Sequence, residues 1–378
     1  MKQEEIVLNG TFAEAKIFTK NINQETIDQV QRLVDHPYAS GSEIRVMPDT
    51  HIGKGAVVGT TMTFTDKIVP DVVGVDIGCG MFVAKLGKLD VKKQDLQKLD
   101  EMIRKYIPSG TGVRSKPHEW SSEIDLSNIH AELTEHNRIE RSIGSLGGGN
   151  HFIELNQDER GNHYLVIHSG SRSLGQMVAK YHQQKAIQYW KERNNQTAEG
   201  HPVDAEFAYL EGEDLDAYLN DMAITQRYAH LNRKVMMQEI TRAMKWEPEQ
   251  TFDVVHNYVD IPNRIIRKGA ISAQEGERIL IPINMRDGSV LARGKGNPDW
   301  NYSAPHGAGR LLSRTQARKK LKLNEFQQAM KGIYSTSVRK STLDEAPFAY
   351  KPMEEILERT KQTMTDVQVL KPLYNFKA

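Results

Sequence analysis

Two kinds of apolar pattern divide this chain, and together they limit the folds that it can adopt. Short runs bounded by Gly, Pro or Asp are typical of β-strands, and they occur at 44–47, 56–59, 61–64 and 164–167. Helical spacing of apolar residues occurs at about 90–106, 174–192 and 215–244. Because polar candidate ligands are spread over both parts, we predict a single large α+β domain over residues 1–378, with a mixed β-sheet core and flanking helices. Two polar stretches, 114–137 and 193–214, are predicted to be a long loop and a surface excursion.

The composition excludes several classes of protein. With 38% hydrophobic and 26% charged residues, the chain has ordinary globular usage. One cysteine excludes an intramolecular disulfide, no uncharged apolar run approaches a membrane span, and the first residues lack a signal-peptide pattern. We therefore expect a cytoplasmic protein in a reducing compartment. The formal net charge is +1, so a polyanionic partner must be held by a local patch of basic residues.

The only cysteine lies in a turn that is suited to metal binding. Cys79 follows Asp76 by three residues, between Gly78 and Gly80. A carboxylate and a thiolate at this spacing can converge on one cation, because the glycines let the backbone turn tightly. The alternative is a buried structural thiol, since free cysteine often packs as a small hydrophobic residue.

Three histidines favour the metal interpretation. His168 ends the apolar run 164–167, His256 ends the run 252–255, and His151 follows three glycines. A single histidine at a strand end is commonly a hydrogen-bonded core residue, but three in matching contexts form a set with Asp76 and Cys79. Imidazole, thiolate and carboxylate together suit one or two transition ions such as Mn, Zn, Fe or Co, not an all-oxygen Mg or Ca cage. We predict a metal site at these strand ends.

A fourth histidine has a different setting. His306 is followed by Gly307, Ala308 and Gly309, and Arg310 lies four positions on. Small residues permit the close approach of a phosphate, an arginine can neutralise it, and a neutral imidazole is a competent nucleophile toward phosphorus. A basic glycine-rich loop without catalytic function is the alternative.

Basic residues are concentrated near the end of the chain, and they form the candidate for the local patch that a polyanionic partner needs. The members are Arg310, Arg314, Arg318, Lys319, Lys320, Lys322, Lys331, Arg339 and Lys340. Such a run suits a polyanionic partner, and a solvated helix face is the alternative. The last ten residues are apolar enough to dock on the protein rather than fray.

Seven ordered motifs resemble those of the RtcB-type RNA ligases and extend over about residues 45–378. They are Met47–His51, Asp71–Gly80, Gly149–Glu154, His168–Arg172, His256–Asn257, His306–Arg310 and Ala349–Lys351. The resemblance implies an enzyme that joins RNA with a 3′-phosphate or 2′,3′-cyclic phosphate to a 5′-hydroxyl RNA, using GTP and two Mn²⁺ ions. It implies RNA as partner, such as broken or spliced tRNA or rRNA, and no membrane. A monomer is compatible with it, as is an activating protein or a release-factor-like co-actor.

The resemblance also implies roles for individual residues. Cys79 would bridge the two ions, Asp76 and His151 would complete one metal site, and His168 and His256 the other. His306 would carry GMP, with Asp49 orienting its ring. The positions that would contact the nucleotide are Asn150, Glu154, His256, Asn257, Pro282, Asn284, Met285, Ser289, His306, Gly307, Ala308, Gly309 and Lys377.

One position departs from the family pattern, and two other functional classes remain open. Pro305 stands where a small polar residue or cysteine is expected before the nucleophile. A dinuclear phosphodiesterase acting on RNA ends without ligation would use the same metal ligands, but it would not need His306 or Lys377. A non-catalytic RNA-binding protein would need the basic patch but not the metal ligands.

Overall fold

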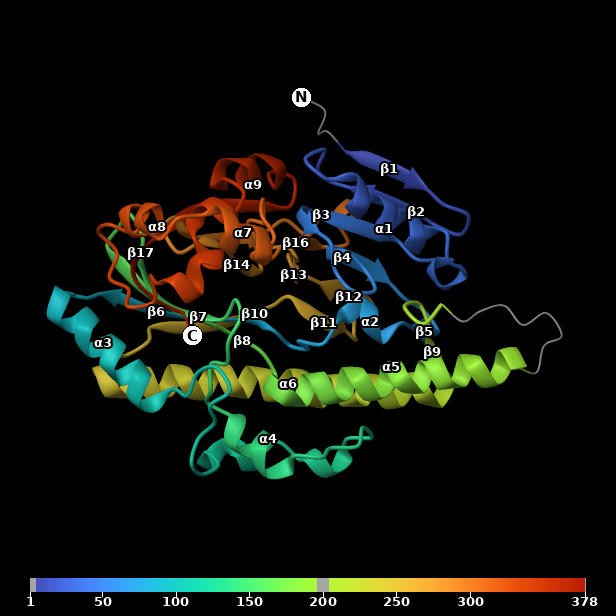
Figure 1. Cartoon of the computed structure of the whole chain (residues 1–378), viewed down its shortest axis with the longest axis horizontal. Coiled ribbons are helices and arrows are strands. Elements are labelled where there is room, and N and C mark those ends of the chain that lie inside the picture. Colours follow the sequence, from blue (N-terminus) through green and yellow to red (C-terminus); the bar gives the residue numbers. More distant parts are fainter. Residues whose placement is uncertain (1–4, 196–203, 378) are drawn as a thin grey trace.

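The computed structural model describes residues 5–195 and 204–377, and its strands form two large sheets (Figure 1). The first has six strands in the order β1-β2-β3-β4-β12-β11, and it is mixed because only β2 and β3 run parallel. Its strands are β1 (Ile6–Asn9), β2 (Glu14–Ile17), β3 (Ile44–His51), β4 (Val58–Thr63), β12 (Ile265–Lys268) and β11 (Asn257–Asp260).

The second large sheet has seven strands in the order β10-β6-β8-β7-β17-β15-β14, and all of its neighbours run antiparallel. Its strands are β10 (Gln250–Val255), β6 (Gly80–Lys88), β8 (Asn162–Ser169), β7 (Phe152–Gln157), β17 (Met364–Lys377), β15 (Gly288–Gly294) and β14 (Arg278–Asn284). Two small sheets pair β13 (Ala270–Ser272) with β16 (Ser303–Pro305) and β5 (Lys67–Ile68) with β9 (Leu210–Glu211).

The helices flank these sheets. The α-helices are α1 (Gln24–Val34), α2 (Pro70–Val73), α3 (Lys93–Tyr106), α4 (His136–Ser142), α5 (Arg172–Asn195), α6 (Gly212–Met244), α7 (Arg314–Lys320), α8 (Leu323–Ala329) and α9 (Met353–Arg359). Short 3-10 helices are η1 (Pro37–Ala39), η2 (Glu119–Glu123), η3 (Leu126–Asn128), η4 (Pro298–Trp300), η5 (Lys340–Glu345) and η6 (Pro347–Ala349). Among the residues that the structure describes, every helix is too short or too polar for a membrane span.

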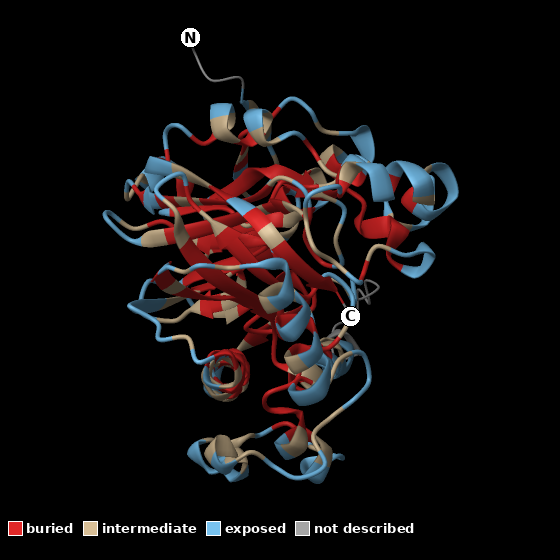
Figure 2. Cartoon of the chain, turned by 90° about the vertical axis from the view of Figure 1, so that its left-hand side faces the viewer, coloured by how far each residue is buried: buried red, intermediate tan, exposed pale blue. Residues whose placement is uncertain are grey.

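Successive residues along the strands of the seven-stranded sheet point to opposite faces, and both faces are buried (Figure 2). On β6, Met81 and Val83 pack into one hydrophobic cluster with β14 and β15, whereas Phe82 and Ala84 pack into another with α3 and α6. This follows from the period of two along a strand. The strand ends are therefore held rigidly between two packed layers.

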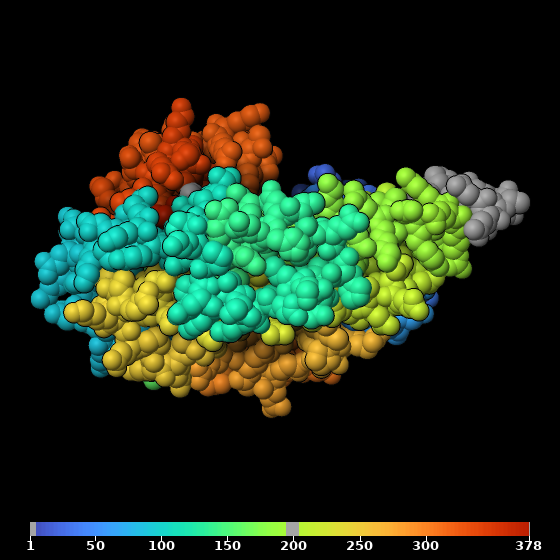
Figure 3. Space-filling view, turned by 90° about the horizontal axis from the view of Figure 1, so that it is seen from below, coloured from blue at the N-terminus to red at the C-terminus, as the bar shows by residue number. Residues whose placement is uncertain are grey.

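The long helices α5 and α6 lie side by side beneath the sheets, and the segment that contains η2, η3 and α4 covers them on the outside (Figures 1 and 3). The helix α6 begins at Gly212 with the acidic residues Glu213 and Asp214 in its first turn, where they interact favourably with the helix dipole. It ends where Lys245 adopts a left-handed conformation. It spans 33 residues, long enough to contact several strands.

The α+β class, the mixed sheet and the flanking helices are confirmed, and the predicted helices at 90–106, 174–192 and 215–244 correspond to α3, α5 and α6. The separate strands predicted at 56–59 and 61–64 are wrong, because one strand, β4, spans Val58–Thr63 and accommodates Gly59 at φ 99°. The stretch 114–137 lacks strands, as expected, but contains η2, η3 and the start of α4. Part of the predicted excursion at 193–214, residues 196–203, lies outside the described residues.

Candidate active site

The register of the seven-stranded sheet brings the predicted metal ligands together. The start of β6 pairs with the ends of two neighbours, Met81 with His168 on β8 and Gly80 with Val255 on β10. In an antiparallel sheet the start of one strand lies beside the ends of its neighbours, so residues flanking these termini meet. Cys79 precedes β6, His256 follows β10, and the backbone N–H of His256 donates to Cys79 O. His151 precedes β7, where Phe152 is paired with His168.

The five side chains form a continuous row, which we call the metal-ligand cluster: Asp76, His151, Cys79, His168 and His256. Cys79 Sγ lies 3.5 Å from His151 Nε2 and 3.2 Å from His168 Nε2. On one side, His151 Nε2 lies 3.2 Å from Asp76 Oδ2. On the other, the Nε2 atoms of His168 and His256 are 3.3 Å apart. The sulfur therefore lies between two pairs of potential ligands.

The outer nitrogens of two imidazoles are engaged with the backbone. His151 Nδ1 lies 2.8 Å from Leu146 O and His168 Nδ1 lies 3.3 Å from Asn150 O. These contacts place the proton on Nδ1 and leave Nε2 as a lone pair, the arrangement in which histidine binds metals. One ligand atom from each of Cys79, His151 and His168 lies within 4.8 Å of the others. These donors fit a transition metal, because a cation relieves the repulsion between the lone pairs that face one another.

The pKa shifts of His168, His256 and Asp76 favour the deprotonated forms that bind metals. Burial holds the pKa of His168 and of His256 well below the ordinary histidine value, so both rings are neutral. Burial raises the pKa of Asp76, but the hydrogen bond and charge that a protonated His151 supplies outweigh burial, and the pKa falls to about 2. A bound cation would take the place of the proton on His151 Nε2. Burial and the Asp76 carboxylate raise the pKa of the Cys79 thiol. A bound cation would be needed to deprotonate it, since metal ligation takes the proton from a coordinating thiol.

His306 comes from a different sheet and faces the same region. It follows β16, and its ring centroid lies 4.9 Å from that of His256. His306 Nδ1 lies 2.7 Å from Oδ2 of the buried Asp49, although a linear hydrogen bond would need a small rotation of the ring. Gly307 N donates to the same oxygen at 3.2 Å. Gly309 has φ 71°, and a Cβ there would lie 2.5 Å from Asp49 O, so the backbone can approach Asp49 because this residue is glycine.

A cavity opens beside His306, and most of the predicted nucleotide contacts line it. They are Asn150, Glu154, His256, Pro282, Asn284, Met285, His306, Gly307, Ala308, Gly309 and Lys377. Asn257 and Ser289 do not line this cavity. The Asn257 side chain accepts a hydrogen bond from Gly269 N at 2.8 Å, behind His306, and Ser289 is fully buried. Asn284 accepts from the backbone N–H groups of Arg286 and Asp287, so its side chain oxygen is engaged in a turn.

Two carboxylates in the cavity wall have contrasting environments. Glu154 is buried beside Asn156 and Asn375, and its burial raises its pKa to about 7. Glu345 is also buried, but Lys377 and Arg314 hold its pKa below the usual range despite burial. Two acids with separated pKa values beside one cavity are a common feature of functional sites.

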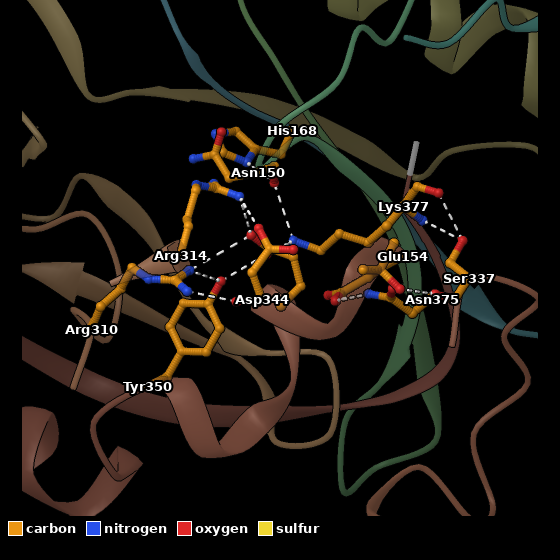
Figure 4. Close-up of polar contacts among 12 residues, drawn as sticks. Asn150, Glu154, His168, Arg310, Arg314, Ser337, Asp344, Tyr350, Asn375 and Lys377 are labelled. Carbon is orange, nitrogen blue, oxygen red and sulfur yellow. Dashed lines mark hydrogen bonds and ion pairs between the residues drawn. The ribbon is translucent and has the colours of Figure 1, made fainter. Parts of the chain in front are cut away.

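Glu345 was not predicted, and it organises one end of the cavity. Lys377 Nζ forms an ion pair with it, Arg314 Nη1 lies 2.8 Å from it and Tyr350 OH donates to it at 2.7 Å. Figure 4 shows the side chains of Lys377, Arg314 and Tyr350 converging on one region. Lys377 Nζ also donates to Asn150 O, at 3.3 Å. Nothing in the sequence near Glu345 indicates this role, because its partners come from three separated segments.

The basic stretch divides into two groups. Arg310, Arg314 and Arg318 are engaged by Asp344 and Glu345, with Arg318 Nε 3.1 Å from Asp344 Oδ1. Lys319 and Lys320, in contrast, are exposed at the end of α7. Arg310 and Arg314 therefore belong to the cavity wall, whereas Arg318 and the two lysines are exposed on the surface.

The comparisons with known proteins agree with this architecture. A sequence model of the family described as tRNA-splicing ligase RtcB matches residues 29–135 and 122–378. The RNA-splicing ligase RtcB of Escherichia coli strain K12 is 31% identical over 91% of this chain and 92% of that protein. The tRNA-splicing ligase RtcB of Methanococcus maripaludis is 27% identical over 94% of this chain and 92% of that protein. The fold and site thus define an α+β protein with a buried cluster of side chains that could hold a metal ion. The chain belongs to the RtcB family, and this membership supports an RNA ligase activity.

Proposed function

We propose that this protein is a GTP- and Mn²⁺-dependent RNA ligase acting in RNA repair or tRNA splicing. It would join RNA 3′-phosphate or 2′,3′-cyclic phosphate ends to 5′-hydroxyl ends through a histidine–GMP intermediate. The observation that carries the proposal is the position of His306, which lines a cavity together with His168 and His256 of the metal-ligand cluster. Membership of the RtcB family supports the ligase class.

The proposal of two ions rests on the arrangement of the metal-ligand cluster. Asp76 with His151, and His168 with His256, lie on opposite sides of the Cys79 sulfur, so each pair would hold one ion and the thiolate would be shared. The mixed donor set accepts Mn²⁺ and also other transition ions. When bound, such ions would neutralise a triphosphate and polarise its α-phosphorus.

His306 is placed to act as the nucleophile. Contact of Nδ1 with Asp49 leaves Nε2 free to form a bond with the α-phosphorus of GTP, and the bond to the β-phosphate oxygen breaks to release pyrophosphate. Asp49 balances the positive charge that develops on the ring. An oxygen of the RNA 3′-phosphate would then take GMP from the histidine. Finally the 5′-hydroxyl would attack that RNA phosphorus, losing its proton and expelling GMP.

The far end of the cavity suits a guanine base. A carboxylate such as Glu154 can accept from the ring N–H and amino group of guanine, and the Lys377 ammonium can donate to its O6. Both side chains line the cavity, and both are buried. Adenine presents an amino donor where guanine has O6, so the lysine would favour GTP.

RNA would reach this site over the exposed end of α7, where Lys319 and Lys320 can contact phosphates. A cytoplasmic location and one catalytic domain over residues 1–378 stay predictions. A phosphodiesterase would use the same metal ligands, but the contact of Asp49 with His306 is what a nucleophilic histidine needs and hydrolysis does not.

Incubation with α-labelled GTP and Mn²⁺, followed by denaturing electrophoresis, tests this function. We expect label on the protein that is stable to alkali and lost in acid, as for a phosphoramidate. The His306→Ala variant should take up no label and join no RNA, while retaining its metal. Failure of the wild-type protein to take up label while it cleaves cyclic phosphates would favour the phosphodiesterase instead.

A further inference from the structure

A buried arginine lies directly behind the metal-ligand cluster. Arg233 is on α6, and its side chain is fully buried. Its Nη1 donates to two backbone carbonyls, Gly78 O at 2.6 Å and Ser169 O at 2.8 Å. Its Nε and Nη2 donate to the two carboxylate oxygens of Asp253, at 2.9 and 2.6 Å. One guanidinium thus contacts three separate segments of the seven-stranded sheet region.

Each contacted segment carries a predicted metal ligand. Gly78 immediately precedes Cys79, and Ser169 immediately follows His168. Asp253 lies three residues before His256, within β10. Arg233 therefore ties together the turn before β6, the end of β8 and the last part of β10. These segments hold the Cys79 thiol, which would be shared between the ions, and both histidines of one predicted metal site.

The two backbone carbonyls explain why a positively charged side chain, Arg233, lies at this position. The oxygens of Gly78 and Ser169 both point at one nitrogen, and without a donor they would repel each other and separate. A guanidinium has several donors in a rigid planar fork, so the directions of its hydrogen bonds are fixed relative to one another. A lysine ammonium has donors that rotate freely and is not an equivalent replacement.

Asp253 keeps the arginine in place. Its pKa is raised by burial, but Arg233 and His230 lower it, and the net shift is downward, so the carboxylate is ionised. His230 Nδ1 lies 2.9 Å from Asp253 Oδ2, and this histidine is about half exposed. A buried ion pair adds little net stability compared with apolar packing, so its presence here calls for another explanation.

We infer that Arg233, held by Asp253, is a positioning residue that sets the spacing of Cys79, His168 and His256 before metal binds. This inference rests on the proposed metal binding at the cluster. Partners that orient metal ligands typically contribute a factor of about 10 to 100 in metal affinity. Arg233 orients three ligand-bearing backbones instead of one ligand side chain.

The test compares metal affinity in Arg233→Lys and Asp253→Asn with a matched control, Arg267→Lys. Arg267 is also fully buried, ion-paired with Asp260 at 2.8 Å and hydrogen-bonded to Ser303 Oγ and Tyr258 OH. Among the described residues, its hydrogen-bond and ion-pair partners lie outside the metal-ligand cluster. Three quantities are measured. The first is the Mn²⁺ dissociation constant, obtained from the paramagnetic resonance signal of free Mn²⁺. The others are the sulfur-to-metal absorption of the Co²⁺-loaded protein and the free energy of unfolding without metal.

We expect Arg233→Lys to weaken Mn²⁺ binding by about 10- to 100-fold and to shift the cobalt–sulfur absorption, with Asp253→Asn weakening it less. Arg267→Lys should lose stability without a change in metal affinity beyond about twofold, since it lies outside the ligands' surroundings. Unchanged Mn²⁺ affinity in Arg233→Lys would contradict the inference. Equal weakening in Arg267→Lys at equal loss of stability would also contradict it.

The wild-type protein separates this inference from the proposed function. Absence of Mn²⁺ and Co²⁺ binding by the wild type would refute the metal site itself, whereas normal wild-type binding isolates the contribution of Arg233. If neither Arg233→Lys nor Asp253→Asn folds, the pair is required by the fold and its assignment to ligand spacing is rejected.

Discussion

In the metal-ligand cluster, a histidine can direct one ring nitrogen toward a backbone oxygen and the other toward the remaining members of the cluster. His168 uses Nδ1 against Asn150 O and leaves Nε2 facing the Cys79 sulfur. His163, on the same strand, is equally buried but contacts the backbone of Leu89 and Gly87 at the strand's far end. Burial alone therefore does not distinguish a candidate ligand from a core histidine, whereas a ring nitrogen directed at other potential ligands does.

His168→Ala and Cys79→Ser are expected to lose metal and ligation without unfolding, because a methyl or a hydroxyl cannot replace an imidazole or a bridging thiolate. Metal analysis of the purified variants and RNA joining assays measure this. His163→Ala is the control, since it removes an equally buried ring but no ligand. Full metal content with normal joining in both cluster variants would refute the ligand assignment.

Glu154→Gln should change how stability depends on pH. Burial raises the folded-state pKa of Glu154 to about 7, above its ordinary value, so the stability present at low pH is lost as the pH rises through 7. Glutamine does not ionise, so the variant has no such loss. Between pH 5 and pH 8, the difference in unfolding free energy between the variant and the wild type should therefore grow in favour of the variant, toward about 3 kcal/mol. Denaturant unfolding without nucleotide measures this. The exposed Glu358→Gln control should show no such trend; a flat difference for Glu154→Gln would contradict the assigned burial effect.

Lys377→Ala should raise the GTP requirement and narrow the preference for GTP over ATP. Loss of one charged hydrogen bond costs about 1.5–3 kcal/mol, or roughly ten- to over a hundredfold in affinity. Metal content should stay intact, and the exposed Lys371→Ala on the same strand should behave as wild type. Undiminished discrimination between GTP and ATP would remove Lys377 from the base-binding site.

At the scale of elements, the sequence pattern indicates some parts better than others. The histidines at strand ends and the long helices were predictable, because each is preceded by an apolar run or has helical periodicity. The late strands β11 to β17 were mostly missed, since their pairing depends on residues far apart in the chain. The predicted docking of the chain end on the protein is confirmed, because the residues up to Lys377 form the strand β17. Its register against β7 places Lys377 opposite Phe152.

The end of helix α7 is expected to contact RNA phosphates. Lys319→Ala with Lys320→Ala should weaken RNA binding and reduce its salt dependence by about one unit per lost phosphate contact. Arg318 is left intact because it also binds Asp344. Guanylylation, which needs no RNA, should be unchanged, and Lys93→Ala with Lys98→Ala on α3 provides the control. An unaltered dependence of RNA affinity on salt concentration would show that these lysines belong to a solvated helix face and do not contact RNA.

At the scale of the whole molecule, the site combines three sheets. The metal-ligand cluster lies at the ends of adjacent strands of the seven-stranded sheet, whereas Asp49 comes from β3 of the six-stranded sheet and His306 follows β16 of a two-stranded sheet. Motifs in the sequence identify these residues, but residues such as Glu345 and Arg233 become apparent only when their partners are placed. Their partners are backbone carbonyls and side chains of distant segments, which carry no local sequence signal.

The central claim is that His306 carries GMP. Mass spectrometry of the protein after incubation with GTP and Mn²⁺, followed by proteolysis at neutral to alkaline pH, tests this most directly. The account predicts that the peptide containing His306 gains the mass of one GMP group, with fragmentation placing it on that imidazole. A GMP adduct on a lysine or another histidine, or none on a metal-loaded protein that still joins RNA, would contradict it.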